Sequence, residues 1–172
     1  MQPFLPIAPF AGLLADLAND LRRGVCCLVI ADKGWVNFLY RDVFERLRAT
    51  GVNCVFINGR PAENDPPDDT GVMLVALRQL RKATRSLEEE GKVVVLPHLD
   101  VMATKQDGWT SISREMVPLL YEDPAMVLLG FRDPSLPLLP VVDKLFQRKY
   151  LIDQPFRPPF PEHHPAAVST SG

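Results

Sequence analysis

The segment that decides the fold of this chain runs from Val93 to Asp100 and reads VVVLPHLD. Its first four residues are apolar and mostly β-branched, which is typical of a strand buried on both faces of a parallel sheet. The strand ends at Pro97, and polar residues follow it at once. Ligands of open α/β sheets bind beyond the carboxyl ends of the strands, so this junction is where we first look for a site.

The rest of the chain predicts four more strands separated by amphipathic helices. We expect strands at 25–30, 52–57, 126–130 and 149–152, and helices at 9–23, 35–50, 71–90, 112–121 and 138–146. This alternation predicts an α/β fold with a three-layer open parallel sheet of about five strands. After Asp153 the composition becomes rich in proline. We therefore assign 1–153 to one domain and 154–172 to a linker or disordered tail.

Composition excludes several function classes. The formal net charge is −2, which gives no basic face for nucleic acid, and no apolar run reaches the ~18 residues of a membrane helix. We expect a soluble cytoplasmic protein that binds neither nucleic acid nor membrane. Cys26, Cys27 and Cys54 lack metal-ligand spacing, so we expect three buried free thiols and no metal site.

The loop after the first strand has the frame of a phosphate-binding loop without its chemistry. Gly34 takes the place of the last glycine, while Trp35 and Val36 take the places of the lysine and of the magnesium-binding hydroxyl. An indole supplies no cation and an isopropyl group does not ligate Mg²⁺, so the charge neutralisation that phosphoryl transfer needs is lost. We expect the Asp32 carboxylate to cap the following helix. Lys33 is an alternative cation, although its direction differs.

The third and fourth strands repeat this pattern. Pro97 and His98 stand where an Asp that helps to hold magnesium and a Glu that activates water would follow a catalytic strand, and Asp100 matches a further acidic position. His98 has the chemistry of a general base. Without a metal or a positioned phosphate it has no substrate, so we favour a hydrogen-bonded structural histidine. The fourth strand leads to Arg132 at the position of a polar sensor.

With these motifs in this order, residues 24–153 resemble the large subdomain of an AAA+ ATPase with degenerate Walker A, Walker B and sensor 1 motifs. The resemblance implies a P-loop NTPase fold without the helical lid, a vestigial nucleotide pocket, no catalytic residue and no cofactor. It also makes Arg132, Lys144 and Arg148 candidates for an interface with other AAA+ subunits or with a C-terminal ATPase domain. The acidic loop at 58–69 has no aromatic residue, which argues against threading of polypeptide.

The sequence thus predicts a catalytically inactive AAA+-like domain that acts as a structural, regulatory or assembly module of a larger, hexameric ATPase. Trp35 should pack in or over the vestigial pocket. Two alternatives stay open. One is a divergent nucleotidase that binds ATP and magnesium with Lys33 and Arg132 and uses His98 or Asp100 in catalysis. The other is a small α/β signalling or partner-binding domain unrelated to AAA+ proteins.

Overall fold

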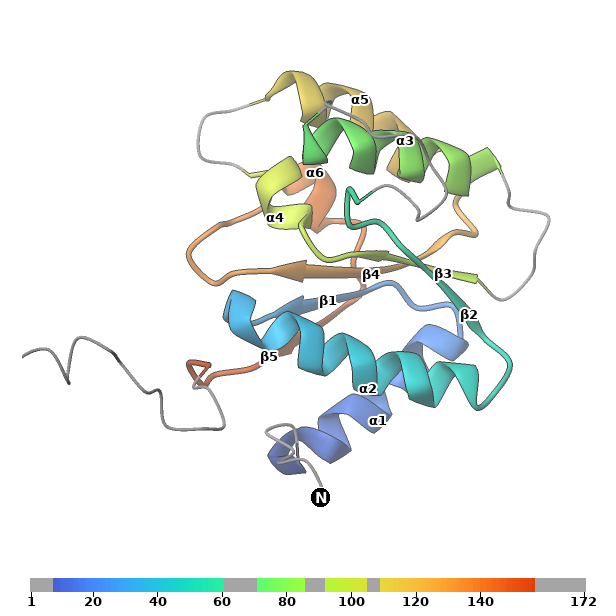
Figure 1. Cartoon of the computed structure of the whole chain (residues 1–172), viewed down its shortest axis with the longest axis vertical. Coiled ribbons are helices and arrows are strands. Elements are labelled where there is room, and N and C mark those ends of the chain that lie inside the picture. The colour runs from blue at the N-terminus through green and yellow to red at the C-terminus, as the bar shows by residue number, and fades with distance from the viewer. Residues whose placement is uncertain (1–7, 61–70, 86–91, 105–108, 157–172) are drawn as a thin grey trace, which may run out of the picture.

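The computed structural model describes residues 8–60, 71–85, 92–104 and 109–156. Within these ranges the chain forms a five-stranded, all-parallel sheet with helices on both faces (Figure 1). The predicted α/β class and the number of strands are confirmed. The strands are β1 (Cys27–Ile30), β2 (Asn53–Phe56), β3 (Lys92–Leu96), β4 (Val127–Arg132) and β5 (Arg148–Leu151).

The strand order across the sheet is β2-β3-β4-β1-β5. From β1 the chain crosses to the β2 edge, returns through β3 and β4 to the side of β1, and then crosses β1 to reach β5. The order reverses beside β1, and the carboxyl ends of β1, β4 and β3 become neighbours. The three junctions that the sequence singled out therefore lie at one edge of the sheet.

Helices cover the two faces of the sheet in separate groups (Figure 1). One face carries the 3-10 helices η1 (Ala8–Phe10) and η2 (Lys33–Trp35) with α1 (Ala11–Arg22) and α2 (Val36–Arg48). The other face carries α3 (Val72–Arg85), α4 (Leu99–Met102), α5 (Ser111–Tyr121) and α6 (Pro140–Asp143). Each face buries its own hydrophobic cluster, and the central strands β1, β3 and β4 contribute to both. This explains why these strands read as nearly continuous apolar runs.

Some boundaries differ from those expected. Helix α4 was not predicted, because four residues are too few for a helical period to show. Helix α6 spans Pro140–Asp143, where 138–146 was expected, and β4 continues beyond 130 to include Arg132. The end of the expected 71–90 helix, the acidic stretch 61–70 and the tail 157–172 lie outside the described residues.

The three cysteines are free thiols, as predicted, but only Cys27 is fully buried. Burial raises the pKa of Cys27 to about 12 and that of Cys54 to about 11, so both stay protonated at neutral pH. In the part of the chain that the structure describes, no helix has the length and apolar character needed to span a membrane.

Candidate functional site

A partly buried ion pair joins the ends of β1 and β3. Lys33 Nζ lies 2.7 Å from Asp100 Oδ1 and donates a second hydrogen bond to the carbonyl oxygen of Pro97 at 3.1 Å. The Asp100 side chain is completely buried in the first turn of α4, while that of Lys33 is 34% exposed. A buried carboxylate is stable only with partners of this kind, so the pair fixes the two strand ends relative to each other.

The same carboxylate also binds the loop after β4. Asp100 Oδ2 accepts a hydrogen bond from Asp133 N at 2.7 Å, and Oδ1 accepts one from Val101 N at 2.9 Å. We call Lys33, Asp100 and Asp133 the strand-end clasp, because they join the loops that follow β1, β3 and β4. Sequence reasoning placed Asp100 at a motif position but missed its partners. One signal could have predicted these contacts: the carboxyl ends of parallel strands meet at one edge of the sheet, so residues that directly follow different strands lie close together.

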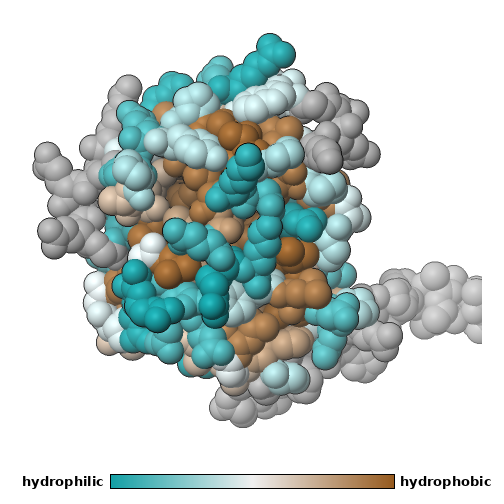
Figure 2. Space-filling model, turned by 180° about the vertical axis from the view of Figure 1, so that it is seen from behind, coloured by the Kyte–Doolittle hydropathy of each residue, from teal (hydrophilic) through white to brown (hydrophobic). Residues whose placement is uncertain are grey.

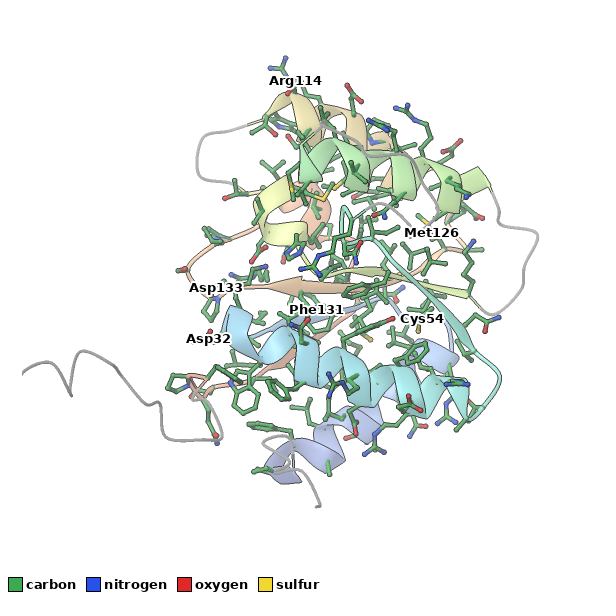
Figure 3. The ribbon with its side chains drawn as sticks, in the orientation of Figure 1. Asp32, Cys54, Arg114, Met126, Phe131 and Asp133 are labelled. Atoms are coloured by element: carbon green, nitrogen blue, oxygen red, sulfur yellow. The ribbon has the colours of Figure 1, made fainter. Side chains whose placement is uncertain are left out.

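Asp133 shapes its own loop. Its Oδ1 accepts hydrogen bonds from Ser135 N at 2.9 Å and Ser135 Oγ at 2.6 Å. These bonds are the main reason why the pKa of Asp133 is lowered, and Lys33 adds to the effect. Asp133 is therefore ionised at neutral pH. Figure 3 shows it at the same edge of the sheet as Asp32, opposite the edge where Cys54 and Met126 lie.

The loop after β1 is closed by residues of the chain itself. Asp32 is a capping residue as predicted, but it caps the 3-10 turn η2 and not α2: its Oδ1 accepts a hydrogen bond from Gly34 N at 3.0 Å, and the N-terminus of α2 has no side-chain cap. Its Oδ2 accepts one from Phe156 N at 3.3 Å. The Phe156 ring covers Gly34 so closely that a Cβ added to this glycine would lie 2.4 Å from ring atoms. Phe156, which composition assigned to the tail, thus packs against the domain.

Trp35 completes this closed region. Its side chain is 5% exposed, and Nε1 donates a hydrogen bond to the carbonyl oxygen of Gln154 at 2.8 Å. The indole packs edge-on against Phe10 and Phe156, with ring centroids 5.2 and 5.3 Å apart. Its predicted burial is confirmed. The indole does not line the cleft described next, because it packs against the aromatic residues of η1 and the C-terminal segment. Its predicted place in or over a vestigial nucleotide pocket stays a prediction.

An open cleft of about 220 Å³ lies beside the clasp, at the carboxyl ends of β1, β2 and β3. Four of the residues singled out in the sequence line it, together with four that were not. The lining residues are Lys33, Val36, Asn37, Phe56, Asn58, Arg60, Pro97 and His98. The structure thus brings residues that follow β1 and β3 together around one cleft. Sequence reasoning missed Asn58 and Arg60, which follow β2 directly.

His98 faces this cleft in a half-buried position. None of the hydrogen bonds between described residues involves its imidazole, and the expected hydrogen-bonded role stays a prediction. Burial, with Lys33 and Arg60 nearby, lowers the pKa of His98, although Asp100 opposes the effect. The imidazole is therefore neutral at pH 7 and offers one donor and one acceptor.

The cationic residues predicted for a sensor and an interface lie elsewhere. The Arg132 guanidinium donates hydrogen bonds to the carbonyl oxygens of Asp133 at 3.1 Å and Pro134 at 3.3 Å, so it turns onto its own loop. Arg148 Nε lies 3.2 Å from Asp20 Oδ2 and joins β5 to α1. Lys144 is exposed. The predicted subunit interface stays a prediction, and two of its three residues have partners within the chain.

Comparison with known proteins gives no family. No protein-family model matches the chain, and no curated protein matches its sequence. Among solved structures, one chain of the E. coli MS115-1 HORMA:CdnC:Trip13 complex is similar, with a TM-score of 0.46 and 13% sequence identity. The match covers 86% of the present chain and 54% of that chain, so this protein spans about half the length of the chain it matches there. A likeness at this level assigns neither a family nor an activity.

Proposed function

We propose that the chain is a catalytically inactive AAA+-like domain that works as a structural or assembly module. The strand-end clasp is the observation that carries this proposal. Phosphoryl transfer needs a cation and a metal that face the substrate phosphates. Here Lys33, which lies two positions before the lysine position of the motif, is paired with Asp100 of its own chain. Asp100 in turn accepts a hydrogen bond from Asp133 N. The Lys33 ammonium and the Asp100 carboxylate therefore bind each other, whereas a nucleotidase would use such groups to bind its ligand.

The closed loop after β1 supports the same proposal. In a phosphate-binding loop, backbone N–H groups at the start of a helix must be accessible to phosphate oxygens. In this chain the Asp32 carboxylate binds Gly34 N, and the Phe156 ring lies over Gly34. The adjacent Trp35 is buried against aromatic residues. A triphosphate bound to Gly34 N would have to displace the Asp32 carboxylate and the Phe156 ring.

The position of Arg132 counts against the nucleotidase alternative. That alternative needs Lys33 and Arg132 to act on one ligand, whereas the Arg132 guanidinium binds carbonyl oxygens of its own loop. Arg132 also does not line the cleft that contains Lys33. We therefore keep the inactive module as the proposed function, with other AAA+ subunits or an ATPase domain as its proposed partners.

The exposed surface fits a module that assembles through modest contacts. Seen from behind, the molecule shows hydrophobic areas separated by hydrophilic side chains (Figure 2). Large exposed hydrophobic residues of the described chain are scattered over several elements; they are Val72, Leu74, Val101, Trp109, Tyr121 and Leu151. Scattered apolar residues are normal on monomeric proteins, so a partner must add contact area from further domains.

Nucleotide titration tests the proposal directly. The purified chain is titrated with ATP and with ADP, with and without Mg²⁺, by calorimetry, and phosphate release is followed in parallel. We expect no magnesium-dependent heat of binding and no hydrolysis above the buffer background. Magnesium-dependent phosphate release that disappears in His98→Ala or Asp100→Ala would show that the site is catalytic and would overturn the proposal.

A further inference from the structure

The cleft beside the clasp has a lining that favours an anion. The eight described residues that surround it include no carboxylate, but they include the cations Lys33 and Arg60 and the amides of Asn37 and Asn58. The nearest buried acid, Asp100, already accepts hydrogen bonds from three donors. Its negative charge is therefore compensated by Lys33 and two backbone N–H groups. The second acid near Lys33, Asp133, binds Ser135 and does not line the cleft, whose described lining carries the cations Lys33 and Arg60.

Several lining groups keep donors for a ligand. A lysine ammonium has three N–H donors, and Lys33 uses two of them, on Asp100 and Pro97. The side-chain oxygen of Asn58 accepts a hydrogen bond from Arg60 N at 2.9 Å, which leaves its amide NH₂ as a donor. Hydrogen bonds from ionised donors to an anion are the stronger kind.

The loop that brings Asn58 and Arg60 to the cleft is held in place. Gln79 of α3 accepts a hydrogen bond from Gly59 N and donates one to the carbonyl oxygen of Arg60, both at 2.8 Å. Gly59 has a φ of +75°, and a Cβ there would lie 2.3 Å from the carbonyl oxygen of Val72. Only glycine fits this position, so the backbone that presents the two donors is fixed before any ligand arrives.

The size of the cleft limits the ligand. At about 220 Å³ it is smaller than the ~300–1,000 Å³ of usual ligand pockets, which favours a small ligand. Its donors come from the ends of three strands and therefore approach from several directions. This arrangement suits the tetrahedral oxygens of a phosphoryl group better than a planar carboxylate.

We infer that this cleft binds a small phosphate dianion, either free inorganic phosphate or the phosphoryl group of a small phosphomonoester, held by Lys33, Asn58, Arg60 and His98. The inference goes beyond the proposed function. Lys33 and His98 are among the positions that carry the AAA+ resemblance, but binding of a small anion requires neither an intact Walker motif nor ATP. It differs from a phosphate-binding loop in its donors, which are side chains from the ends of β1, β2 and β3. Binding requires neither a nucleotide nor magnesium.

Titration with inorganic phosphate tests the inference. ¹H–¹⁵N NMR spectra of the wild-type chain are recorded without Mg²⁺ up to about 20 mM phosphate, at an ionic strength kept constant with chloride. We expect saturable shifts of the Asn58 side-chain amide and of the His98 signals. The variant Arg60→Gln should weaken binding about tenfold, which is the effect of losing one charge-assisted hydrogen bond. Circular dichroism verifies that each variant is folded.

The matched control is Arg132→Gln, which removes an equal charge outside the cleft and should leave phosphate affinity unchanged. Glycerol phosphate and succinate form two further arms. If glycerol phosphate binds as tightly as inorganic phosphate, the site is assigned to phosphomonoesters. If glycerol phosphate does not bind, the site is assigned to free phosphate. Succinate should bind more weakly than inorganic phosphate. Any of three results would overturn the inference: no saturable shifts in the folded wild-type protein, equal weakening of phosphate binding by the two arginine variants, or tighter binding of succinate than of phosphate.

The two proposals fail separately. A chain that binds phosphate in the cleft but hydrolyses ATP with magnesium would refute the inactive module and leave the phosphate site standing. A chain that shows neither phosphate shifts nor ATP turnover would refute the phosphate site alone.

Discussion

Two regions at the carboxyl edge of the sheet contrast with each other. The loop after β1 is closed by its own chain, because Asp32 caps η2 and Phe156 covers Gly34. A short distance away, Lys33, Arg60 and His98 surround an open cleft. The strand-end clasp lies between the two regions, since Lys33 belongs to both the clasp and the cleft. The comparison teaches that one loop at this edge can be closed by its own chain while the neighbouring strand ends leave an open cleft with two cations.

Breaking the clasp should give the largest effect. Lys33→Met leaves the fully buried Asp100 carboxylate without its cation, and we expect the free energy of unfolding to fall by about 3 kcal/mol. This value is at the lower end for a buried pair, because Lys33 itself is 34% exposed. Urea denaturation measures the loss.

A surface ion pair provides the matched control for this variant. Lys149 Nζ lies 2.6 Å from Asp143 Oδ2, with the two side chains 44% and 38% exposed. Exposed pairs contribute ~0–1 kcal/mol, so Lys149→Met should change stability by no more than that. If Lys33→Met costs no more than Lys149→Met, the clasp does not stabilise the fold.

Opening the closed loop should give the second largest effect. Gly34→Ala introduces a methyl group 2.4 Å from the Phe156 ring, and we expect a cost of ~1–3 kcal/mol as the ring moves away. Trp35 reports the movement in a Trp109→Phe background, because its indole packs against Phe156. Its emission should be blue-shifted in the parent and red-shifted in Gly34→Ala.

A double-mutant cycle sharpens this prediction. In a Phe156→Ala background the added methyl group of Gly34→Ala meets no ring, so the two changes should cost less together than the sum of their separate costs. Strict additivity, or unchanged Trp35 emission, would mean that Phe156 does not close the loop.

The frame of the fold was predictable from the sequence, but the contacts that define the site were not. Continuous apolar runs identified β1, β3 and β4, because strands buried on both faces leave a local signal. The Lys33–Asp100 pair joins residues 67 positions apart, and only the strand order brings them together. Composition assigned Phe156 to the tail, since a single aromatic residue among prolines leaves no periodic pattern.

The direction of the Trp35 side chain could not be predicted from the sequence either. Apolar neighbours predicted that the indole is buried, and it is 5% exposed. Whether it faces the cleft or the opposite side depends on the η2 turn, which is three residues long and leaves no periodic signal. Val36, the next residue, lines the cleft instead.

A smaller, pH-dependent effect concerns the open cleft. The pKa of His98 is lowered in the folded protein, chiefly by burial, so the unfolded chain binds this proton more tightly. Stability should therefore fall as the pH drops through the ordinary histidine value of 6.5, and it should be unaffected by this group well above that value. NMR titration should place the His98 midpoint below 6.5.

The variant His98→Gln isolates this contribution. It should reduce the pH dependence of stability between about pH 7 and 5, where histidines titrate and carboxylates stay ionised. Lys33, Arg60 and Asp100 face the imidazole, so added phosphate should raise the His98 midpoint if the cleft binds the dianion. A midpoint at or above 6.5 without phosphate would contradict the proposed environment.

The smallest effect is expected at the predicted subunit edge. In the isolated chain the large exposed hydrophobic residues are scattered, and Arg132 and Arg148 already have partners within the chain. Exposed charge pairs contribute ~0–1 kcal/mol each, so we expect a monomer at micromolar concentration in analytical ultracentrifugation.

Lys144→Glu should leave both the sedimentation coefficient and the stability unchanged, because Lys144 is exposed. Under the proposed function, the same variant should weaken assembly with AAA+ domains. A stable, salt-insensitive hexamer of the isolated chain would show that its apolar surface suffices for assembly.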